Sequence, residues 1–193
     1  GDASGRIARR ASGAAPIRIA GDGRAPFPVT DGADNWAGPI PPDQMPGEID
    51  PPRGWTGSAN HLTAPADYPF VYTSYASPSY RYRRMQTLFA AERVDAGAAW
   101  AAQHDTLNLF AQRLVPILAP ALQTSRDEAV AALGDALAQW DRHDAAGAVE
   151  PTLFQETVRQ LARATFEDEL GADLAADRSE EHTSELQSRM FIS

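Results

Sequence analysis

One asparagine, Asn60, ends the stretch of this sequence that is best suited to chemistry. It follows Gly57, Ser58 and Ala59, small residues that leave room for another molecule to approach the backbone. Its neutral amide donates two hydrogen bonds, and a preorganised neutral donor can stabilise an oxyanion. Asn60 is therefore a candidate oxyanion-hole residue. An asparagine before His61 is also typical of a turn that ends a strand, so residue types alone leave both interpretations open.

The four histidines do not form a recognisable metal or catalytic pattern. They lie at positions 61, 104, 143 and 182, without the His-Glu-x-x-His spacing of a zinc site. His104 and His143 each precede an aspartate, but neighbouring residues on a helix point in different directions, which favours solvated polar faces. The sequence also lacks a Gly-x-Ser-x-Gly elbow. With no cysteine, disulfides, thiolate metal sites and a cysteine nucleophile are excluded.

Composition places the chain among globular proteins. Its 193 residues are 43% hydrophobic and 22% charged, enough for one core with or without an appendage. The net charge of -9 argues against a nucleic-acid partner, which requires clustered basic charge. No run of about 18 apolar residues predicts a membrane span. The chain begins with Gly1 rather than methionine, and we expect it to be a piece of a longer protein.

The first part of the chain, residues 1–80, is predicted to be rich in strands and loops, because prolines, glycines and turn residues are dense in it. The proline-rich residues 39–46 can form neither a helix nor a central strand. The segments expected to be extended are residues 6–10, 17–19, 55–59 and 68–75.

Tyrosines and arginines are interleaved between residues 68 and 84. Such a pattern can bind single-stranded nucleic acid through stacking and charge. The acidic composition disfavours that interpretation, and the tyrosines are more typical of packing at a strand-to-helix junction.

From residue 81 to 177 the hydrophobic period becomes helical, so the chain as a whole is predicted to be α+β. The expected helices cover residues 81–92, 95–105, 106–122, 125–141 and 150–170. The last helix is expected to bury a stripe made of Leu153, Phe154, Val158, Leu161, Phe166 and Leu170.

Several helix ends carry recognisable signals. Asp95 is a good N-cap, and Ser125 begins a capping box with Glu128. Pro151 suits the first position of the last helix and Gly171 suits its C-cap. Pro116 and Pro120 are expected to kink or divide the third helix.

An ordered set of short motifs resembles the β-chain of penicillin acylases. The first motifs are Asp2-x-x-Gly5-x-Ile7, Pro16-Ile17-Arg18, Asp34-Asn35-Trp36-x-Gly38-x-Ile40-Pro41 and Pro52-x-Gly54-x-x-x-Ser58-Ala59-Asn60. Later ones are Tyr68-Pro69, Tyr80-Arg81, Gln103-x-Asp105, Leu114-x-Pro116 and Trp140-Asp141. No single motif is decisive, but the order is specific, and the resemblance covers about residues 1–176.

The resemblance implies an N-terminal-nucleophile hydrolase with a four-layer αββα core, cleaved from a precursor into two chains. The nucleophile of such enzymes is the first β-chain residue, usually serine, whose own α-amino group is the base. The family's oxyanion-hole asparagine falls on Asn60, and its supporting arginine falls on Arg81, which a structural ion pair could equally explain. The internal serines cannot be that nucleophile, because it must carry the free amino terminus. We therefore expect an internal β-chain fragment that is inactive alone.

The resemblance also implies a substrate class and partners. The expected substrate is a small acylated amine, a penicillin, cephalosporin or acyl-homoserine lactone, although no substrate-binding residue is identified. The expected partners are the α-chain and the rest of the β-chain, without nucleic acid or membrane, in the periplasm or outside the cell. No cofactor is expected; the family often binds structural calcium, but apolar Phe70-Val71-Tyr72 stands where an acidic ligand would be expected. The alternative function is a non-catalytic helical protein-interaction module.

Two local departures from the family pattern stand out. His61 follows Asn60 where many relatives have asparagine or another small polar residue, so the rim of the site is expected to differ. Residues 178–188 resemble the translation of a common sequencing-adapter oligonucleotide. We therefore expect residues 178–193 to be a non-native tail.

Overall fold

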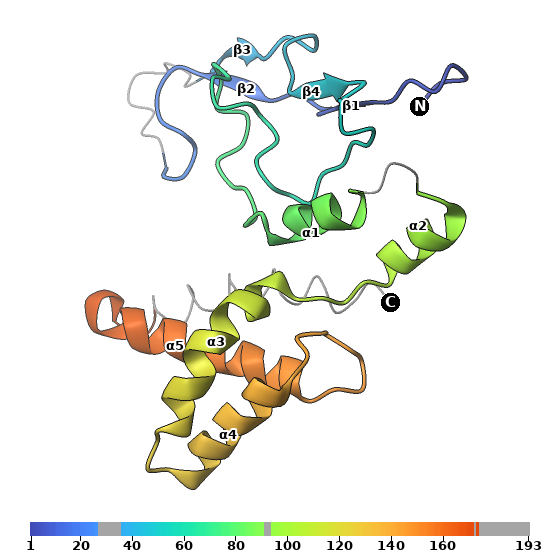
Figure 1. The fold of residues 1–193 in the computed structure, drawn as a ribbon. Helices are drawn as coiled ribbons and strands as arrows, with labels where there is room; N and C mark the ends of the chain where they lie inside the picture. The colour runs from blue at the N-terminus through green and yellow to red at the C-terminus, as the bar shows by residue number, and fades with distance from the viewer. Residues whose placement is uncertain (27–35, 91–93, 172, 174–193) are drawn as a thin grey trace. The chain divides into compact units, whose positions relative to one another are not determined.

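The computed structural model describes residues 1–26, 36–90, 94–171 and 173 of the chain. These residues contain four short strands and five helices, which agrees with the predicted mixture of strands and helices (Figure 1). The chain divides into two compact units, Gly1–Val94 and Asp95–Ser193, and each is described by itself. None of the helices in the described residues is long and apolar enough to cross a membrane.

The strands of the first unit form two antiparallel pairs. β1 (Ala8–Arg10) pairs with β4 (Gly47–Ile49), and β2 (Pro16–Arg18) pairs with β3 (Trp36–Pro39). The predicted strands at residues 6–10 and 17–19 are confirmed within the usual uncertainty of strand ends. The proline-rich segment after Pro39 is a loop, as expected, and it buries Ile40 and Met45.

The extended segments predicted at residues 55–59 and 68–75 are not strands in the structure. Each of the two described sheets has two strands, and neither segment adds to one. Pro69 has no N–H to donate to a ladder, and Gly57 weakens a strand. Individual hydrogen bonds hold them instead. Tyr68 Oη donates to Gln44 O at 3.0 Å, and the Thr63 and Tyr72 hydroxyls lie 2.8 Å apart.

α1 (Tyr80–Leu88) packs against the loop that precedes it (Figure 1). Trp55 lies 5.9 Å from Tyr82 and 5.5 Å from Phe89 between ring centroids. A Cβ at Gly57 would come within 2.5 Å of Met85 Cε, the flexible end of that side chain, so a larger residue there requires Met85 to change its rotamer. These contacts place α1 in the first unit, which ends at Val94. The division predicted at residue 80 has a different basis, because it marks the change from strand-rich to helical sequence.

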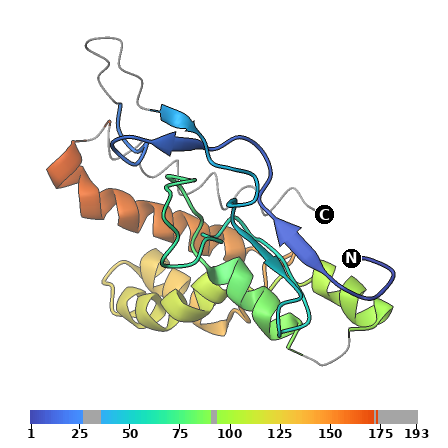
Figure 2. The ribbon, with the colours of Figure 1, turned by 90° about the horizontal axis from the view of Figure 1, so that it is seen from above.

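The second unit is helical. It consists of α2 (Ala96–Gln103), α3 (Leu109–Gln123), α4 (Glu128–Gln139) and α5 (Glu150–Leu170). α4 packs against both α3 and α5, and Figure 2 shows α5 running beside the α3–α4 pair. The buried core consists of Ala111, Val115, Ala119, Leu137, Trp140 and Phe154.

Three of the predicted helix ends are confirmed. Asp95 accepts a hydrogen bond from Ala98 N at 2.8 Å, Pro151 occupies the first turn of α5, and Gly171 ends that helix with φ +77°. The capping box at Ser125 is wrong. Asp127 is the N-cap of α4 and accepts from Ala129 N at 2.9 Å, because its carboxylate lies directly beside the unpaired N–H groups of the first turn.

Pro116 and Pro120 do not divide α3, which runs without a break from Leu109 to Gln123. Both prolines are exposed, and they lie four residues apart on one helix face. On such a face, water can satisfy the carbonyl groups that lose their N–H partners.

The expected buried stripe of α5 is only half buried. Phe154 is fully buried, and Leu153 and Val158 pack against the core. Leu161, Phe166 and Leu170 keep 45%, 41% and 40% of their surface exposed, because the described core of this unit does not reach beyond the first half of the helix. The prediction for these three residues is therefore wrong for the described structure.

Candidate functional site

Asn60 occupies a tight turn between the Trp55 loop and the segment that leads to α1. Its φ is +59°, in the left-handed region that asparagine enters more easily than most residues. The backbone N–H of Ser77 donates to Asn60 O at 2.7 Å, and the preceding Ala59 is buried. The backbone is thus held at the turn while the Asn60 side chain stays exposed.

Arg81, in the first turn of α1, fixes the orientation of this side chain. Its Nη2 donates to Asn60 Oδ1 at 2.8 Å and to Ala59 O at 3.2 Å. Because a guanidinium only donates, the amide oxygen must face Arg81 and the NH₂ group must face away from it. No described residue accepts a hydrogen bond from Asn60 Nδ2. The two predicted site residues therefore lie together, with the amide donors available.

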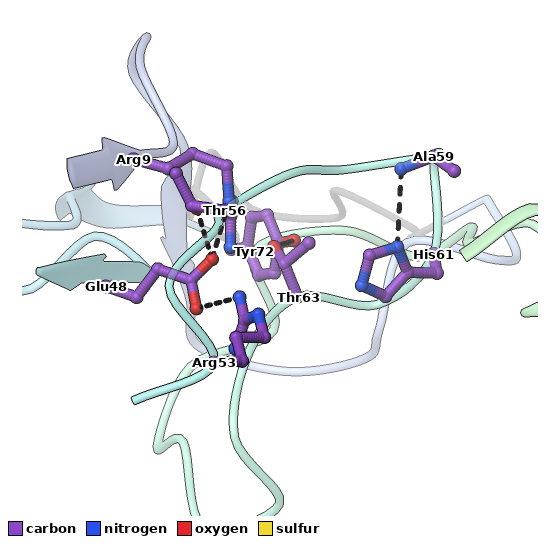
Figure 3. A network of polar contacts seen from close by, with 8 residues as sticks. All are labelled: Arg9, Glu48, Arg53, Thr56, Ala59, His61, Thr63 and Tyr72. Atoms are coloured by element: carbon purple, nitrogen blue, oxygen red, sulfur yellow. Dashed lines mark hydrogen bonds and ion pairs between the residues drawn. The ribbon is translucent and has the colours of Figure 1, made fainter. Parts of the chain in front are cut away.

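The His61 ring covers the other side of the turn. It stacks on Tyr82 of α1 with centroids 3.8 Å apart and an interplanar angle of 20°. Its Nδ1 accepts from the backbone N–H of Ala59 at 3.4 Å (Figure 3). Burial, followed by the charges of Arg9 and Arg53, holds the pKa of His61 below its usual value, although Glu48 acts in the opposite direction.

The charges near His61 come from a polar cluster around Glu48 (Figure 3). Arg9 Nε lies 3.4 Å from Glu48 Oε1, while Arg53 and Thr56 also donate to this carboxylate. Burial raises the pKa of Glu48, but the hydrogen bonds from Thr56 and Arg53 and the charges of Arg53 and Arg9 outweigh it, so the net shift is downward. Two guanidinium groups around one carboxylate leave an excess of positive charge.

Comparison with known proteins identifies the chain's relatives. The profile of the penicillin amidase family matches residues 1–191. The chain belongs to this family. Acyl-homoserine lactone acylase QuiP of Pseudomonas putida is 31% identical over 181 residues, which cover 86% of this chain and 22% of the relative. The QuiP enzyme of Pseudomonas aeruginosa is 28% identical over 180 residues, covering 86% and 21%. Penicillin acylase 2 proenzyme of a Pseudomonas species is 30% identical over 171 residues, covering 84% and 21%.

This penicillin amidase sequence thus spans about a fifth of the length of these curated relatives. The matched range runs beyond residue 177 into the segment that resembles adapter sequence. Residues 178–193 lie outside the described structure, and their assignment as a non-native tail stays a prediction.

Two other histidines of the penicillin amidase chain, His104 and His143, make local contacts in the second unit. His104 Nδ1 lies 2.9 Å from Trp100 O, and His143 Nδ1 lies 3.0 Å from Thr106 Oγ1. His182 lies outside the described residues. Within the described ranges, no group of three or more histidine, aspartate or glutamate side chains is arranged to hold a metal ion. Residues 70–72 carry no carboxylate, and the expectation that this chain lacks the family's calcium ligands stays a prediction.

Two of the interleaved tyrosines, Tyr68 and Tyr72, pack against each other. The Tyr68 ring lies 5.7 Å from Phe70 and 6.0 Å from Tyr72, in edge-on arrangements. These contacts agree with the structural interpretation of the segment.

Sequence reasoning missed the Glu48 cluster and the His61–Tyr82 stack. Arg9 and Glu48 are 39 residues apart and meet only because β1 pairs with β4 in a register that sets them opposite each other. A charged residue at the centre of each short strand was the available signal, but it does not specify which strands pair.

Proposed function

We propose that this chain is part of an N-terminal-nucleophile amide hydrolase that releases the acyl group of an acylated amine, and that Asn60 supplies one donor of its oxyanion hole. The membership in the penicillin amidase family supports the reaction class. The observation that carries the residue assignment is the hydrogen bond from Arg81 to Asn60 Oδ1 at 2.8 Å.

In the proposed reaction, the hydroxyl oxygen of a serine on a part of the enzyme outside this chain attacks the amide carbonyl carbon. The α-amino group of the same serine takes up the hydroxyl proton and later delivers it to the leaving amine. The carbonyl π electrons move onto oxygen, and Asn60 Nδ2 donates to this oxyanion together with a backbone N–H. Collapse of the tetrahedral intermediate expels the amine, which takes up a proton. Water then hydrolyses the acyl ester by a second oxyanion intermediate and regenerates the serine.

Arg81 has a specific role in this scheme. A terminal amide can rotate by 180° and exchange its oxygen for its NH₂ group. A rotated Asn60 would direct lone pairs at the oxyanion and repel it. Because Arg81 binds the oxygen, it favours the orientation in which both amide hydrogens are available, before any substrate binds.

We extend the proposal to the fold and the substrate. The strand pairs and helices are taken to be part of a four-layer αββα core, completed by an α-chain and the rest of a β-chain. The names of the relatives favour an acyl-homoserine lactone or an acylated β-lactam as substrate. A periplasmic or extracellular location goes with this assignment.

Asn60→Ala in the complete enzyme is the first test. We expect kcat to fall about 10²- to 10³-fold, because one oxyanion donor is worth about 2.7–4 kcal/mol. KM should change little, since the donor acts mainly on the transition state. Steady-state hydrolysis of an acyl-homoserine lactone and of a phenylacetyl amide measures both parameters.

Asn60→Asp is the matched control. Aspartate has the same shape, tolerates positive φ and can pair with Arg81, but it has no amide hydrogen to donate. We expect a folded enzyme with at least as large a loss of kcat. Near-normal turnover of both variants would remove Asn60 from the oxyanion hole. The 193-residue chain alone should be inert in the same assays, and turnover by it would contradict the external nucleophile.

A further inference from the structure

Two adjacent residues of α1 hold the turn around Asn60 from two sides. Arg81 binds Asn60 Oδ1 and Ala59 O, and Tyr82 stacks on the His61 ring at 3.8 Å. Asn60 thus lies between two anchored residues. A change at His61 would act on the backbone directly next to the amide that the proposed reaction uses.

The hydrogen bond of His61 sets its protonation state. The Ala59 backbone group that lies 3.4 Å from Nδ1 is an N–H, which can only donate. Nδ1 must therefore carry a lone pair, and His61 is neutral in this arrangement. A proton on Nδ1 would place two N–H groups against each other and break the contact.

His104 in the second unit provides the opposite case. Its ring also lies against an aromatic side chain, with centroids 4.4 Å from Trp100. Its Nδ1 faces the Trp100 carbonyl oxygen at 2.9 Å, which can only accept, so Nδ1 carries hydrogen. Protonation of His104 leaves this bond intact. The two histidines therefore differ in whether acid disrupts their local structure.

We propose that His61 is a positioning residue which couples its own protonation to the presentation of the Asn60 amide. When His61 is neutral, it holds the Ala59 N–H and keeps the turn in the observed form. When His61 is protonated, it releases this N–H, the turn opens, and Asn60 no longer holds its donors in one place. This coupling deepens the proposed function. Its effect on turnover rests on that function, whereas its effect on the NMR signals does not.

The groups around His61 favour the neutral form. Tyr82 faces it from α1, Arg9 from β1, Glu48 from β4, and Arg53 from the loop before the turn. Two positive charges against one negative charge oppose protonation, and burial adds to them, which agrees with a lowered pKa. The switch therefore operates on the acid side of 6.5, the ordinary pKa of histidine, and Asn60 stays in place at neutral pH.

NMR titration of the 193-residue chain between pH 4.5 and 8 tests the coupling without measuring turnover. We expect the Asn60 NH₂ signals and the Ala59 amide signal to shift with the same midpoint as the His61 ring, below 6.5. His104→Phe is the matched control and should leave this titration unchanged. Asn60 signals that stay constant while His61 titrates would overturn the proposal.

Two substitutions of His61 separate the effect of the bond from that of the ring. His61→Asn places a non-titrating acceptor where Nδ1 lies, so Asn60 should keep its neutral-pH signals down to pH 4.5. His61→Phe keeps an aromatic ring for Tyr82 but has no acceptor, so Asn60 should show its acid-form signals at every pH. Identical Asn60 signals in the two variants would contradict the proposal.

In the complete enzyme, kcat should show an acid limb with the midpoint of His61. His61→Asn should remove this limb. His61→Phe should lower kcat about 3- to 10-fold, because in the opened turn the Asn60 side chain divides its time between the rotamer that Arg81 binds and the other staggered rotamers. KM should change by less than about twofold. If turnover is absent but the NMR coupling is present, the proposed reaction fails while the His61 switch stands.

Discussion

The two units each hold an asparagine at a structurally important point, and the two are bonded in opposite ways. Asn108, 1% exposed, uses its oxygen to cap α3 by accepting from Ala111 N at 2.9 Å. Its NH₂ group donates to both carboxylate oxygens of Asp144, at 3.2 and 3.1 Å. Asn60 is exposed, its oxygen is held by Arg81, and no described residue accepts from its NH₂ group. One amide is fully used by the fold, while the other keeps its donors available.

Burial explains the difference. A buried amide with an unpaired group costs about 1–3 kcal/mol, so Asn108 is stable in the interior only because both of its ends are bonded. An exposed amide has water as a partner and can leave its donors for a ligand. The contrast indicates that an asparagine whose acceptor is fixed and whose donors face solvent is a stronger candidate for function than a fully bonded one.

Breaking the buried asparagine should have the largest effect on folding. Asn108→Ala removes the N-cap of α3, worth about 1 kcal/mol, and leaves the half-buried Asp144 without its amide donor, worth a further 1–3 kcal/mol. We expect the second unit to lose about 2–4 kcal/mol of unfolding free energy. Urea unfolding followed by circular dichroism measures this loss, and a change below 0.5 kcal/mol would mean that the amide is not structurally required.

A paired substitution sharpens the assignment. Asn108→Asp keeps an oxygen for the cap but sets a carboxylate against Asp144, and it should destabilise the unit. Adding Asp144→Asn restores one donor and one acceptor across the contact, so stability should partly recover. Additive losses in the double variant would argue against direct coupling.

Freeing the exposed asparagine should have a smaller effect. Arg81→Met keeps the length and packing of the side chain but removes the donor that fixes Asn60. We expect kcat of the complete enzyme to fall about 3- to 10-fold, because the amide then samples about three rotamers. Arg81→Lys retains a cationic donor and should lose less. If both variants keep the kcat of the unsubstituted enzyme, Asn60 needs no orienting partner.

The features that the sequence predicts correctly are local. Asp95 caps α2 by accepting from Ala98 N, and Gly171 adopts the positive φ that other residues disfavour. Asn60 was singled out by residue type, whereas Arg81 was found by resemblance to a family, because spacing alone does not reveal the contact between them. The capping box at Ser125 failed locally, because Asp127 caps the first turn through Ala129 N and Val130 N, and α4 therefore begins two residues later than expected.

The features that the sequence does not predict depend on distant pairing. Arg9 and Glu48 meet through the register of β1 and β4, which two strands of three residues each do not specify. Asn108 was not singled out, since its partner Asp144 is 36 residues away. Both ends of its amide are buried and bonded only in the folded chain, where the loop after α4 packs beside the start of α3.

The corrected cap gives a prediction of about 1 kcal/mol. Asp127→Ala should lower the unfolding free energy of the second unit by that amount, because Ala129 N and Val130 N lose their acceptor. Ser125→Ala should change it by less than about 0.5 kcal/mol, although Ser125 Oγ accepts from Asp127 N at 3.2 Å. Thermal unfolding of both variants tests the assignment, and a larger loss at Ser125 would restore the capping box.

The smallest effect concerns an exposed ion pair in the second unit. Glu156 accepts from Arg159 Nη2 at 2.6 Å and Nε at 2.9 Å. Hydrogen bonds from Arg159 and then Gln160 lower the pKa of Glu156 to about 2. A carboxyl group with a lower pKa in the folded chain than in the unfolded chain stabilises the fold at pH values above its unfolded pKa, here 4.5. This contribution is lost as the pH falls from 4.5 through about 2.

The exposure of the carboxylate distinguishes Glu156 in the second unit from Glu48 in the first unit. The Glu156 side chain is 53% exposed, so solvent should limit the pair to about 0.3–0.5 kcal/mol, and 1 M NaCl should remove most of it. Glu48 in the first unit is 21% exposed between two arginines, and its lowered pKa should resist salt. Carboxyl ¹³C titrations of both residues at low and high salt measure the difference. Equal salt sensitivity would mean that the Glu48 cluster is as accessible to ions as an exposed helix face.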